Sequence, residues 1–329
     1  MSSDEHGSAE DRLIARFFKP LATHPGALGL TDDAAILTPP PGCDLVFTTD
    51  AISAGTHFLP DDPPGPLARK ALRTNLSDLA AKGAKPLGFL VSLALWKDIS
   101  ESWLSSFATG LKDDAEKYGC ALLGGDTDRT SGPLTISIAM LGSLPTGTMV
   151  KRAGARAGDA IMVTGTIGDA ALGVRLRRGA AWKVPLEARE YLLSRYLLPQ
   201  PRVALADALR QYASAAMDIS DGLAGDLAKL CRVSHVSASV KASGLPLSEA
   251  AQTVLSNEPA ELETVVSGGD DYEILCTVPP AKLAAFNGAA AAANVQVTQI
   301  GEISKGEGAI IIGPDGKPMA LSRPSYSHF

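Results

Sequence analysis

The chain has 329 residues, of which 45% are hydrophobic and 20% charged, as in a globular protein with a substantial core. A net charge of −6 argues against a nucleic-acid partner, which would need a basic face. No apolar run approaches the roughly 20 residues that span a bilayer, and the polar, acidic start is unlike a secretory signal peptide. We therefore expect a cytoplasmic protein with no membrane partner.

The first part of the sequence alternates helix-like and strand-like segments. Apolar side chains at helical spacing predict helices at residues 11–18, 67–82 and 102–118. Apolar runs between turns rich in Gly and Pro predict strands at residues 31–37, 45–50, 88–95, 121–123 and 134–141. Pro and Gly then cluster at residues 144–147, which predicts two domains, 1–147 and 148–329.

The second part has the same mixed character. Strands are expected at residues 160–164, 215–219, 238–241, 272–278 and 295–303, with a hairpin-like segment at 309–312. Helices are expected at residues 169–178, 187–198, 203–211, 223–230, 247–255 and 281–293. Because strands and helices mix in both parts, we expect an α/β (α+β) fold with two domains.

One stretch, residues 216–227, concentrates acidic side chains where a predicted strand gives way to a helix. It contains Asp218, Ser220, Asp221 and Asp226. Ser220 or Asp221 is expected to be the N-cap of the helix, because a short side-chain oxygen can accept the N–H groups of the first turn.

Similar short carboxylates recur at predicted strand ends and glycine turns, beside Thr, Ser or Gly. They are Asp32, Asp33, Asp50, Asp126, Asp218 and Asp221, with Asp78 on a predicted helix. Each alone is typical of a turn or cap. Acids brought together are costly without a cation between them, and Mg²⁺ prefers oxygen ligands. The set therefore favours a magnesium site, to which Thr48 and Thr49 could add hydroxyl oxygens.

Several other chemistries lack their signatures. The sequence has no Walker A loop, no protein-kinase motif set and no evident nucleophilic triad. Its four cysteines lie far apart in the sequence, which favours small buried hydrophobes over a zinc site. The turn at residues 165–169 is compatible either with a phosphate-binding loop or with a plain strand-to-helix turn.

A series of blocks in fixed order resembles a known family. The blocks are TDDAAIL (31–37), TTDAISAGTHF (48–58), NLSDLAAKGAKP (75–86), LLGGDT (122–127), KRAGARAGD (151–159), VTGTIGDAALG (163–173), MDISDGL (217–223), SGGDDYEIL (267–275) and YSHF (326–329). From about residue 11 to 329, the chain resembles the thiamine-monophosphate kinases of the aminoimidazole-ribonucleotide synthetase-like superfamily.

This resemblance implies ATP-dependent phosphorylation of thiamine monophosphate to thiamine diphosphate with several Mg²⁺ ions. It also implies an active-site cleft between the domains and a homodimer formed through the N-terminal domain. The implied metal ligands are Asp33, Thr48, Thr49, Asp50, Asp78, Asp126, Asp218 and Asp221. The implied ATP contacts are Gly125, Asp126, Arg152 and Ser220, and the implied contacts to thiamine monophosphate are His57, Asp270 and Tyr326. Asp78, Asp126 and Asp218 are expected to be the catalytic carboxylates.

Two positions depart from the family pattern. Thr31 stands where a Gly is usual, and Asp270 stands where a Glu is usual. A Gly would ease backbone approach to a phosphate, and Asp is one methylene shorter than Glu. Asp226 has no counterpart among the implied ligands, so we expect it to be a solvated acid on the helix.

The implied chemistry is consistent with the residue types. A phosphate monoester acceptor is already anionic, so positioning and charge neutralisation matter more than a general base. Arg152 could contact a phosphate with two hydrogen bonds, and Tyr326 could stack on the cationic thiazolium ring. We expect direct in-line transfer. The alternatives are another ATP-dependent synthetase of the superfamily or a non-catalytic nucleotide- or metal-binding homologue.

Overall fold

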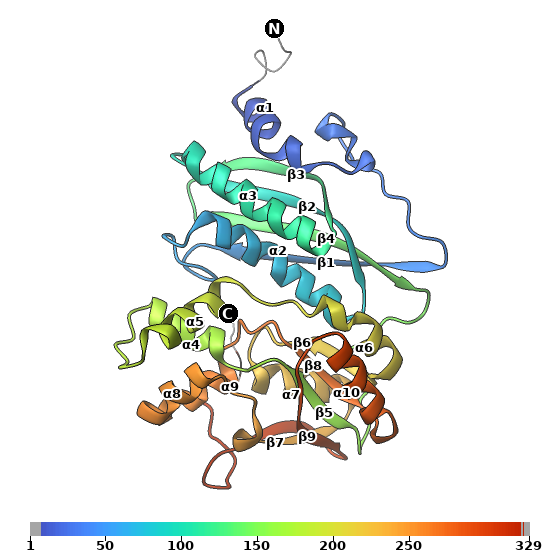
Figure 1. The fold of residues 1–329 in the computed structure, drawn as a ribbon, viewed down its shortest axis with the longest axis vertical. Coiled ribbons are helices and arrows are strands. Elements are labelled where there is room, and N and C mark those ends of the chain that lie inside the picture. The colour runs from blue at the N-terminus through green and yellow to red at the C-terminus, as the bar shows by residue number, and fades with distance from the viewer. Residues whose placement is uncertain (1–7, 324, 326–329) are drawn as a thin grey trace. The chain divides into compact units, whose positions relative to one another are not determined.

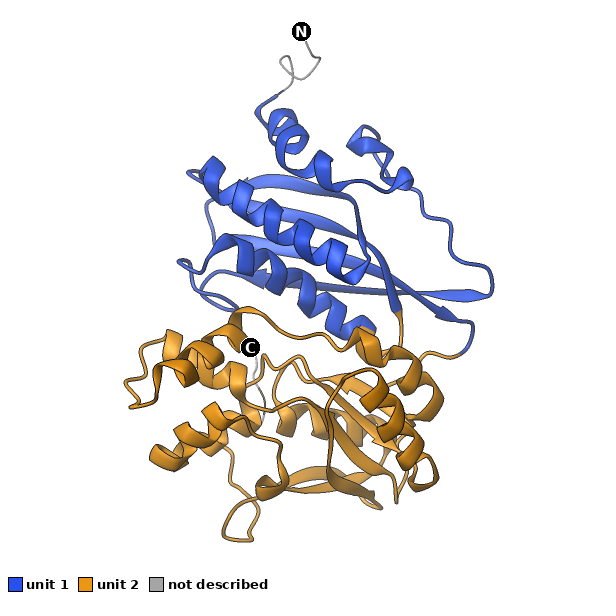
Figure 2. Ribbon diagram, viewed as in Figure 1, with its two compact units in different colours: residues 1–79, 85–147 blue, residues 80–84, 148–329 orange. Residues whose placement is uncertain are grey.

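The computed structural model describes residues 8–323 and 325, which form two compact units (Figure 2). Unit 1 comprises residues 1–79 and 85–147, and unit 2 comprises residues 80–84 and 148–329. No helix in the described part of the chain is both long enough and apolar enough to cross a membrane.

Unit 1 is built on a four-stranded sheet in the order β1-β4-β2-β3. Its strands are β1 (Cys43–Ser53), β2 (Lys85–Trp96), β3 (Ala121–Thr130) and β4 (Thr135–Pro145). β4 runs antiparallel to both β1 and β2, whereas β2 and β3 are parallel. Figure 1 shows helices α2 (Pro64–Ala81) and α3 (Glu101–Tyr118) lying across one face of this sheet.

The two faces of the sheet have different roles, as β4 illustrates. Ile136, Ile138 and Met140 are almost fully buried, in keeping with the face that the helices cover. The alternate residues Ser137 and Ala139 point to the opposite face, where they line a cavity.

The expected strand at residues 31–37 is wrong, because this segment forms no sheet pairing. It is largely exposed and lies just before Pro39, Pro40 and Pro41, which have no N–H to give to a ladder. The expected helix at 11–18 is present as helix α1 (Ala9–Leu13) followed by a π-helical turn, Ile14–Phe18.

The acids expected at strand ends in unit 1 lie inside strands instead. Asp50 is within β1, and Asp126 is within β3, opposite Ser92 of β2. β3 extends through the double glycine because the strands approach closely there: a Cβ on Gly125 would lie 1.9 Å from the carbonyl oxygen of Val91. The glycines thus permit a strand where a turn was expected.

Unit 2 contains a six-stranded sheet in the order β10-β7-β9-β5-β8-β6. The strands are β5 (Ala160–Thr164), β6 (Ala215–Asp218), β7 (Ser237–Lys241), β8 (Ile274–Val278), β9 (Val297–Ser304) and β10 (Gly308–Ile312). The helices are α4 (Asp169–Arg177), α5 (Leu186–Leu197), α6 (Ala206–Tyr212), α7 (Leu223–Ser234), α8 (Glu249–Asn257), α9 (Leu262–Ser267) and α10 (Leu283–Ala292).

Both faces of this sheet are covered. Along β5, Ile161 and Val163 belong to a core that also contains residues of α4, α5 and α7. Ala160 and Met162, on the other face, belong to a core with residues of α6 and α10. Alternate side chains of β5 therefore pack into two separate cores, one on each face of the sheet. This explains why the sequence of β5 is continuously apolar.

Two features of unit 2 differ from the expectation. β10 is not a hairpin partner of β9 but pairs in parallel with β7. The short helix α9 was not predicted. Because α9 has only 6 residues, it offers less than two turns of periodic pattern.

Candidate active site

A cavity of about 720 Å³ in unit 1 gathers part of the predicted site. Asp32 and Asp33 of the loop after residue 30 line it, together with Gly125 and Asp126 of β3. Residues of α1, β2 and β4 complete the wall. The structure therefore brings together the first and fourth sequence blocks, and it places their three acids and the backbone of Gly125 on one concave surface.

A second group lies on the helix-covered side of the same sheet. The hydroxyl of Thr48 donates to the carboxylate of Asp78 on α2. One turn earlier on α2, Asn75 Oδ1 accepts the main-chain N–H of Asp50 at 3.0 Å. Thr49 projects to the opposite face of β1 from Thr48 and Asp50, because neighbouring strand residues alternate. The predicted site acids of unit 1 thus form two groups, with Asp50 and Asp78 on the helix-covered face and Asp33 and Asp126 at the cavity.

His57 lies in the turn that follows β1. Its Nδ1 accepts the main-chain N–H of Ser53 at 3.0 Å. This bond fixes the ring against its own turn.

In unit 2, Asp218 is the last residue of β6 and is 7% exposed. The turn after it differs from the prediction, because the N-cap of α7 is Gly222, which has no capping side chain. The N–H groups of Ser220 and Asp221 instead donate to Asp226 Oδ2, at 3.0 and 2.9 Å.

The expectation that Asp226 is solvated is wrong, since it is fully buried. The pKa of Asp226 is raised overall, because the effect of burial outweighs that of the hydrogen bond from Lys229. Lys229 also pairs with Asp221. Burial lowers the pKa of Lys229, but the hydrogen bonds to the two carboxylates outweigh it and raise the pKa overall.

The loop that carries Asp270 is bonded to this turn. The N–H of Asp270 donates to the carbonyl of Ser220 at 2.8 Å, and that of Tyr272 donates to Ile219 at 2.8 Å. Asp270 and Tyr272 have φ angles of 68° and 51°, in the left-handed region that non-glycine residues rarely adopt. Two sequence blocks about fifty residues apart therefore form one structural unit.

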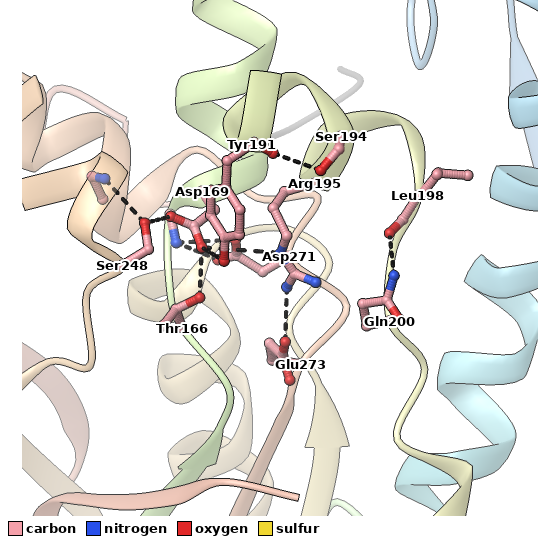
Figure 3. Close-up of polar contacts among 12 residues, drawn as sticks. Thr166, Asp169, Tyr191, Ser194, Arg195, Leu198, Gln200, Ser248, Asp271 and Glu273 are labelled. Atoms are coloured by element: carbon pink, nitrogen blue, oxygen red, sulfur yellow. Dashed lines mark hydrogen bonds and ion pairs between the residues drawn. The ribbon is translucent and has the colours of Figure 1, made fainter. Parts of the chain in front are cut away.

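Behind this loop is a buried polar network that the sequence reasoning missed (Figure 3). Glu273, which is fully buried, accepts hydrogen bonds from Thr164, Arg195 and Arg202. Asp169 accepts from Thr166, Tyr191 and Ser248. The available signal was acids within buried segments: Glu273 directly precedes apolar β8, and Asp169 begins a largely apolar helix.

Asp271 explains the glycine turn at residues 165–169. Both of its carboxylate oxygens accept the N–H of Gly168, at 3.0 and 2.9 Å. That N–H is therefore used inside the protein, which favours the plain strand-to-helix turn over a phosphate loop. Burial raises the pKa of Asp271 well above its ordinary value.

Two predicted residues remain, Arg152 and Tyr326. Arg152 is exposed, and it follows Lys151, whose carbonyl accepts the N–H of Ala216 in β6 at 2.9 Å. Arg152 is thereby tethered beside the strand that ends in Asp218. Tyr326 lies outside the described residues.

The donor set suits a hard cation, although no single cluster makes a complete site. Among residues 8–323 and 325, no three His, Cys, Asp or Glu side chains converge to hold a metal ion. Mg²⁺ needs only one or two carboxylates and fills its other positions with water and substrate phosphates. The all-oxygen pairing of Thr48 with Asp78 and the cavity acids Asp33 and Asp126 fit that requirement.

Family models match both parts of the chain. The N-terminal domain of AIR synthase related proteins matches residues 31–144, and the C-terminal domain matches residues 156–313. Hydrogenase maturation protein HypE of E. coli is similar in fold, with a TM-score of 0.78 at 22% identity.

Thiamine-monophosphate kinases are more similar in sequence. That of Caulobacter vibrioides is 46% identical over 96% of this chain and 89% of its own length. That of Escherichia coli K12 is 39% identical over 97% of this chain and 98% of its own.

Solved structures agree. Thiamine-monophosphate kinase from Stenotrophomonas maltophilia K279a has a TM-score of 0.82 at 38% identity, covering 94% of this chain and 96% of that one. AaThiL complexed with AMPPCP and TMP has a TM-score of 0.78 at 31% identity, covering 91% of each chain. The chain belongs to the AIR synthase related proteins and, within them, to the thiamine-monophosphate kinase family.

Proposed function

We propose that this protein transfers the γ-phosphoryl group of ATP to thiamine monophosphate, forming thiamine diphosphate. The observation that carries the proposal is the cavity lined by Asp33, Gly125 and Asp126, in a chain of this family. A relative bound to AMPPCP and TMP supports the same pair of substrates.

Each group of residues has a proposed role. Asp33, Thr48, Thr49, Asp50, Asp78, Asp126, Asp218 and Asp221 are proposed to hold Mg²⁺, with Asp78, Asp126 and Asp218 as the catalytic carboxylates. Gly125, Asp126, Arg152 and Ser220 are proposed to contact ATP. His57, Asp270 and Tyr326 are proposed to contact thiamine monophosphate.

In this phosphoryl transfer, the main task of the protein is to orient its two substrates. The acceptor is already an anion, so no side chain has to remove a proton from it. Bound Mg²⁺ supplies neutralisation of charge between the two phosphate groups. Gly125 contributes main-chain atoms to the cavity wall, and its missing side chain lets β3 pack closely against β2 there. The rigid backbone pairing between the Ser220 turn and the Asp270 loop would keep the ATP and acceptor contacts in register.

The wider context is also proposed. We propose a cytoplasmic homodimer whose two subunits associate through their N-terminal domains, residues 1–147. The same domain is proposed to bind Mg²⁺ and ATP. Residues 148–329 would complete the active site. The net charge of −6 disfavours nucleic acid as a partner.

Incubation of the full chain with ATP labelled at the γ-position, Mg²⁺ and thiamine monophosphate tests the proposal. We expect label in thiamine diphosphate and none on the protein during turnover. Label trapped on the protein would contradict direct in-line transfer. Failure to form thiamine diphosphate would instead favour a non-catalytic homologue or another superfamily synthetase.

A further inference from the structure

The turn that precedes α7 is held by a carboxylate and an ammonium that the proposed reaction does not use. Asp226 Oδ2 accepts the N–H groups of Ser220 and Asp221, at 3.0 and 2.9 Å. Asp226 Oδ1 accepts from Lys229 Nζ at 2.9 Å. Since Asp226 is fully buried, this carboxylate fixes both the turn and the ammonium.

The bond to Asp226 also holds the Lys229 ammonium beside Asp221, and Lys229 Nζ donates a second hydrogen bond to Asp221 Oδ2. The Lys229 side chain is 27% exposed and that of Asp221 is 32% exposed, so the pair can be reached by solvent. Asp221 is proposed as a metal ligand, and its Oδ2 is already taken by a cation of the protein.

We infer that Lys229 is the resident counter-ion of Asp221, which a divalent cation has to displace in order to bind there. This inference rests on the proposed function, because that function makes Asp221 a metal ligand. An ammonium and a divalent ion compete for the same carboxylate, so the lysine lowers the affinity for the metal. After displacement, Lys229 retains Asp226 as a partner, which limits the cost of the exchange.

Binding of Mn²⁺ alone, followed by electron paramagnetic resonance of the free ion, tests the inference on the full chain. We expect Lys229→Met to bind Mn²⁺ about three- to tenfold more tightly, as for loss of one competing ion pair. Lys229→Arg keeps the charge and is expected to match wild type. Arg232→Met is the matched control, because it removes an exposed charge from the last turn of the same helix.

A double-mutant cycle separates competition at Asp221 from a general charge effect. In the Asp221→Asn background, Lys229→Met is expected to give no gain in affinity. A gain of equal size in both backgrounds, an equal gain in Arg232→Met, or no gain at all would overturn the inference.

Chemical labelling of the wild-type protein gives a second test that does not depend on a folded variant. Addition of Mg²⁺ is expected to raise the rate of Lys229 acetylation severalfold, while the exposed Lys97 remains unchanged. An unchanged or lower rate at Lys229 would contradict displacement. If thiamine diphosphate forms normally but neither Mn²⁺ affinity nor Lys229 acetylation changes as expected, only this inference is contradicted. If no thiamine diphosphate forms, the proposed function is contradicted.

Discussion

The main-chain N–H of Asp270 donates to the carbonyl of Ser220 at 2.8 Å, and this bond joins the two acidic loops of unit 2. Gly269, directly before Asp270, has a φ of +77°, and a Cβ there would lie 2.4 Å from the carbonyl oxygen of Ser220. The contact between the loops therefore depends on a residue without a side chain.

Gly269→Ala is expected to lower the free energy of unfolding by about 2 kcal/mol or more, from strain at positive φ and from the clash. Gly288→Ala is the control, because Gly288 lies within α10 and its added Cβ would meet no atom within 4 Å apart from its chain neighbours and the backbone of its own helix. That change is expected to stabilise by about 0.5–1 kcal/mol. Urea denaturation measures both, and equal stability of Gly269→Ala and wild type would refute the packing described.

Replacement of Glu273 tests the buried network. Glu273→Gln leaves Arg195 and Arg202 without their shared charge, so it is expected to destabilise by about 3 kcal/mol. Arg175→Ala breaks the more exposed pair with Glu261 and is expected to cost under about 1 kcal/mol. Similar losses in the two variants would mean that Glu273 is not a buried charge partner.

The pH dependence of stability reports on Asp271. Burial raises its folded-state pKa, and the nearby charges of Asp169 and Glu273 raise it further. The hydrogen bond from Gly168 and the charge of Arg195 lower the pKa but do not outweigh burial. The folded protein then holds a proton that the unfolded chain loses above a pKa of about 3.9. The Asp271 contribution to the unfolding free energy is therefore largest below that pKa and falls as pH rises toward the folded pKa.

Asp271→Asn removes this titration. The difference in unfolding free energy between wild type and Asp271→Asn is expected to fall as pH rises from about 4, by at most about 1.4 kcal/mol per pH unit. Parallel profiles for the two proteins would show that Asp271 does not keep its proton on folding.

The cysteines are expected to differ in reactivity. Burial raises the pKa of Cys120 and Cys276 to about 12 and that of Cys231 to about 11, whereas Cys43 is only half-buried. A thiol reagent near neutral pH is expected to modify Cys43 first and the other three only in denaturant. Rapid modification of all four cysteines in the native protein would contradict the burial of Cys120, Cys231 and Cys276.

Periodicity and turn residues predicted most elements, and β5 (Ala160–Thr164) matched to the residue. They were wrong where tertiary contacts decide. The close approach of β3 to β2 at Gly125 made a strand of a predicted turn. The pairing of β10 with β7 involves a partner about seventy residues away, which local pattern cannot identify.

For the site, the types and order of the acids predict which residues bind metal and substrate, but they do not predict how the structure holds those residues. The sequence predicts a solvated acid at Asp226, because its helical position does not reveal that its carboxylate accepts the N–H groups of Ser220 and Asp221. Alternation along β1, which separates Thr49 from Thr48, was available from the sequence once the strand was placed.

The central claim is that acids of both units serve one phosphoryl transfer. The rate of thiamine diphosphate formation by Asp126→Asn and Asp218→Asn, beside wild type, tests it most directly. Each variant is expected to remain folded and to lose about 100-fold or more in kcat. Asp98→Asn, an exposed acid outside the cavity, is expected to keep wild-type activity. Full activity in either site variant, or no product from wild type, would contradict the account.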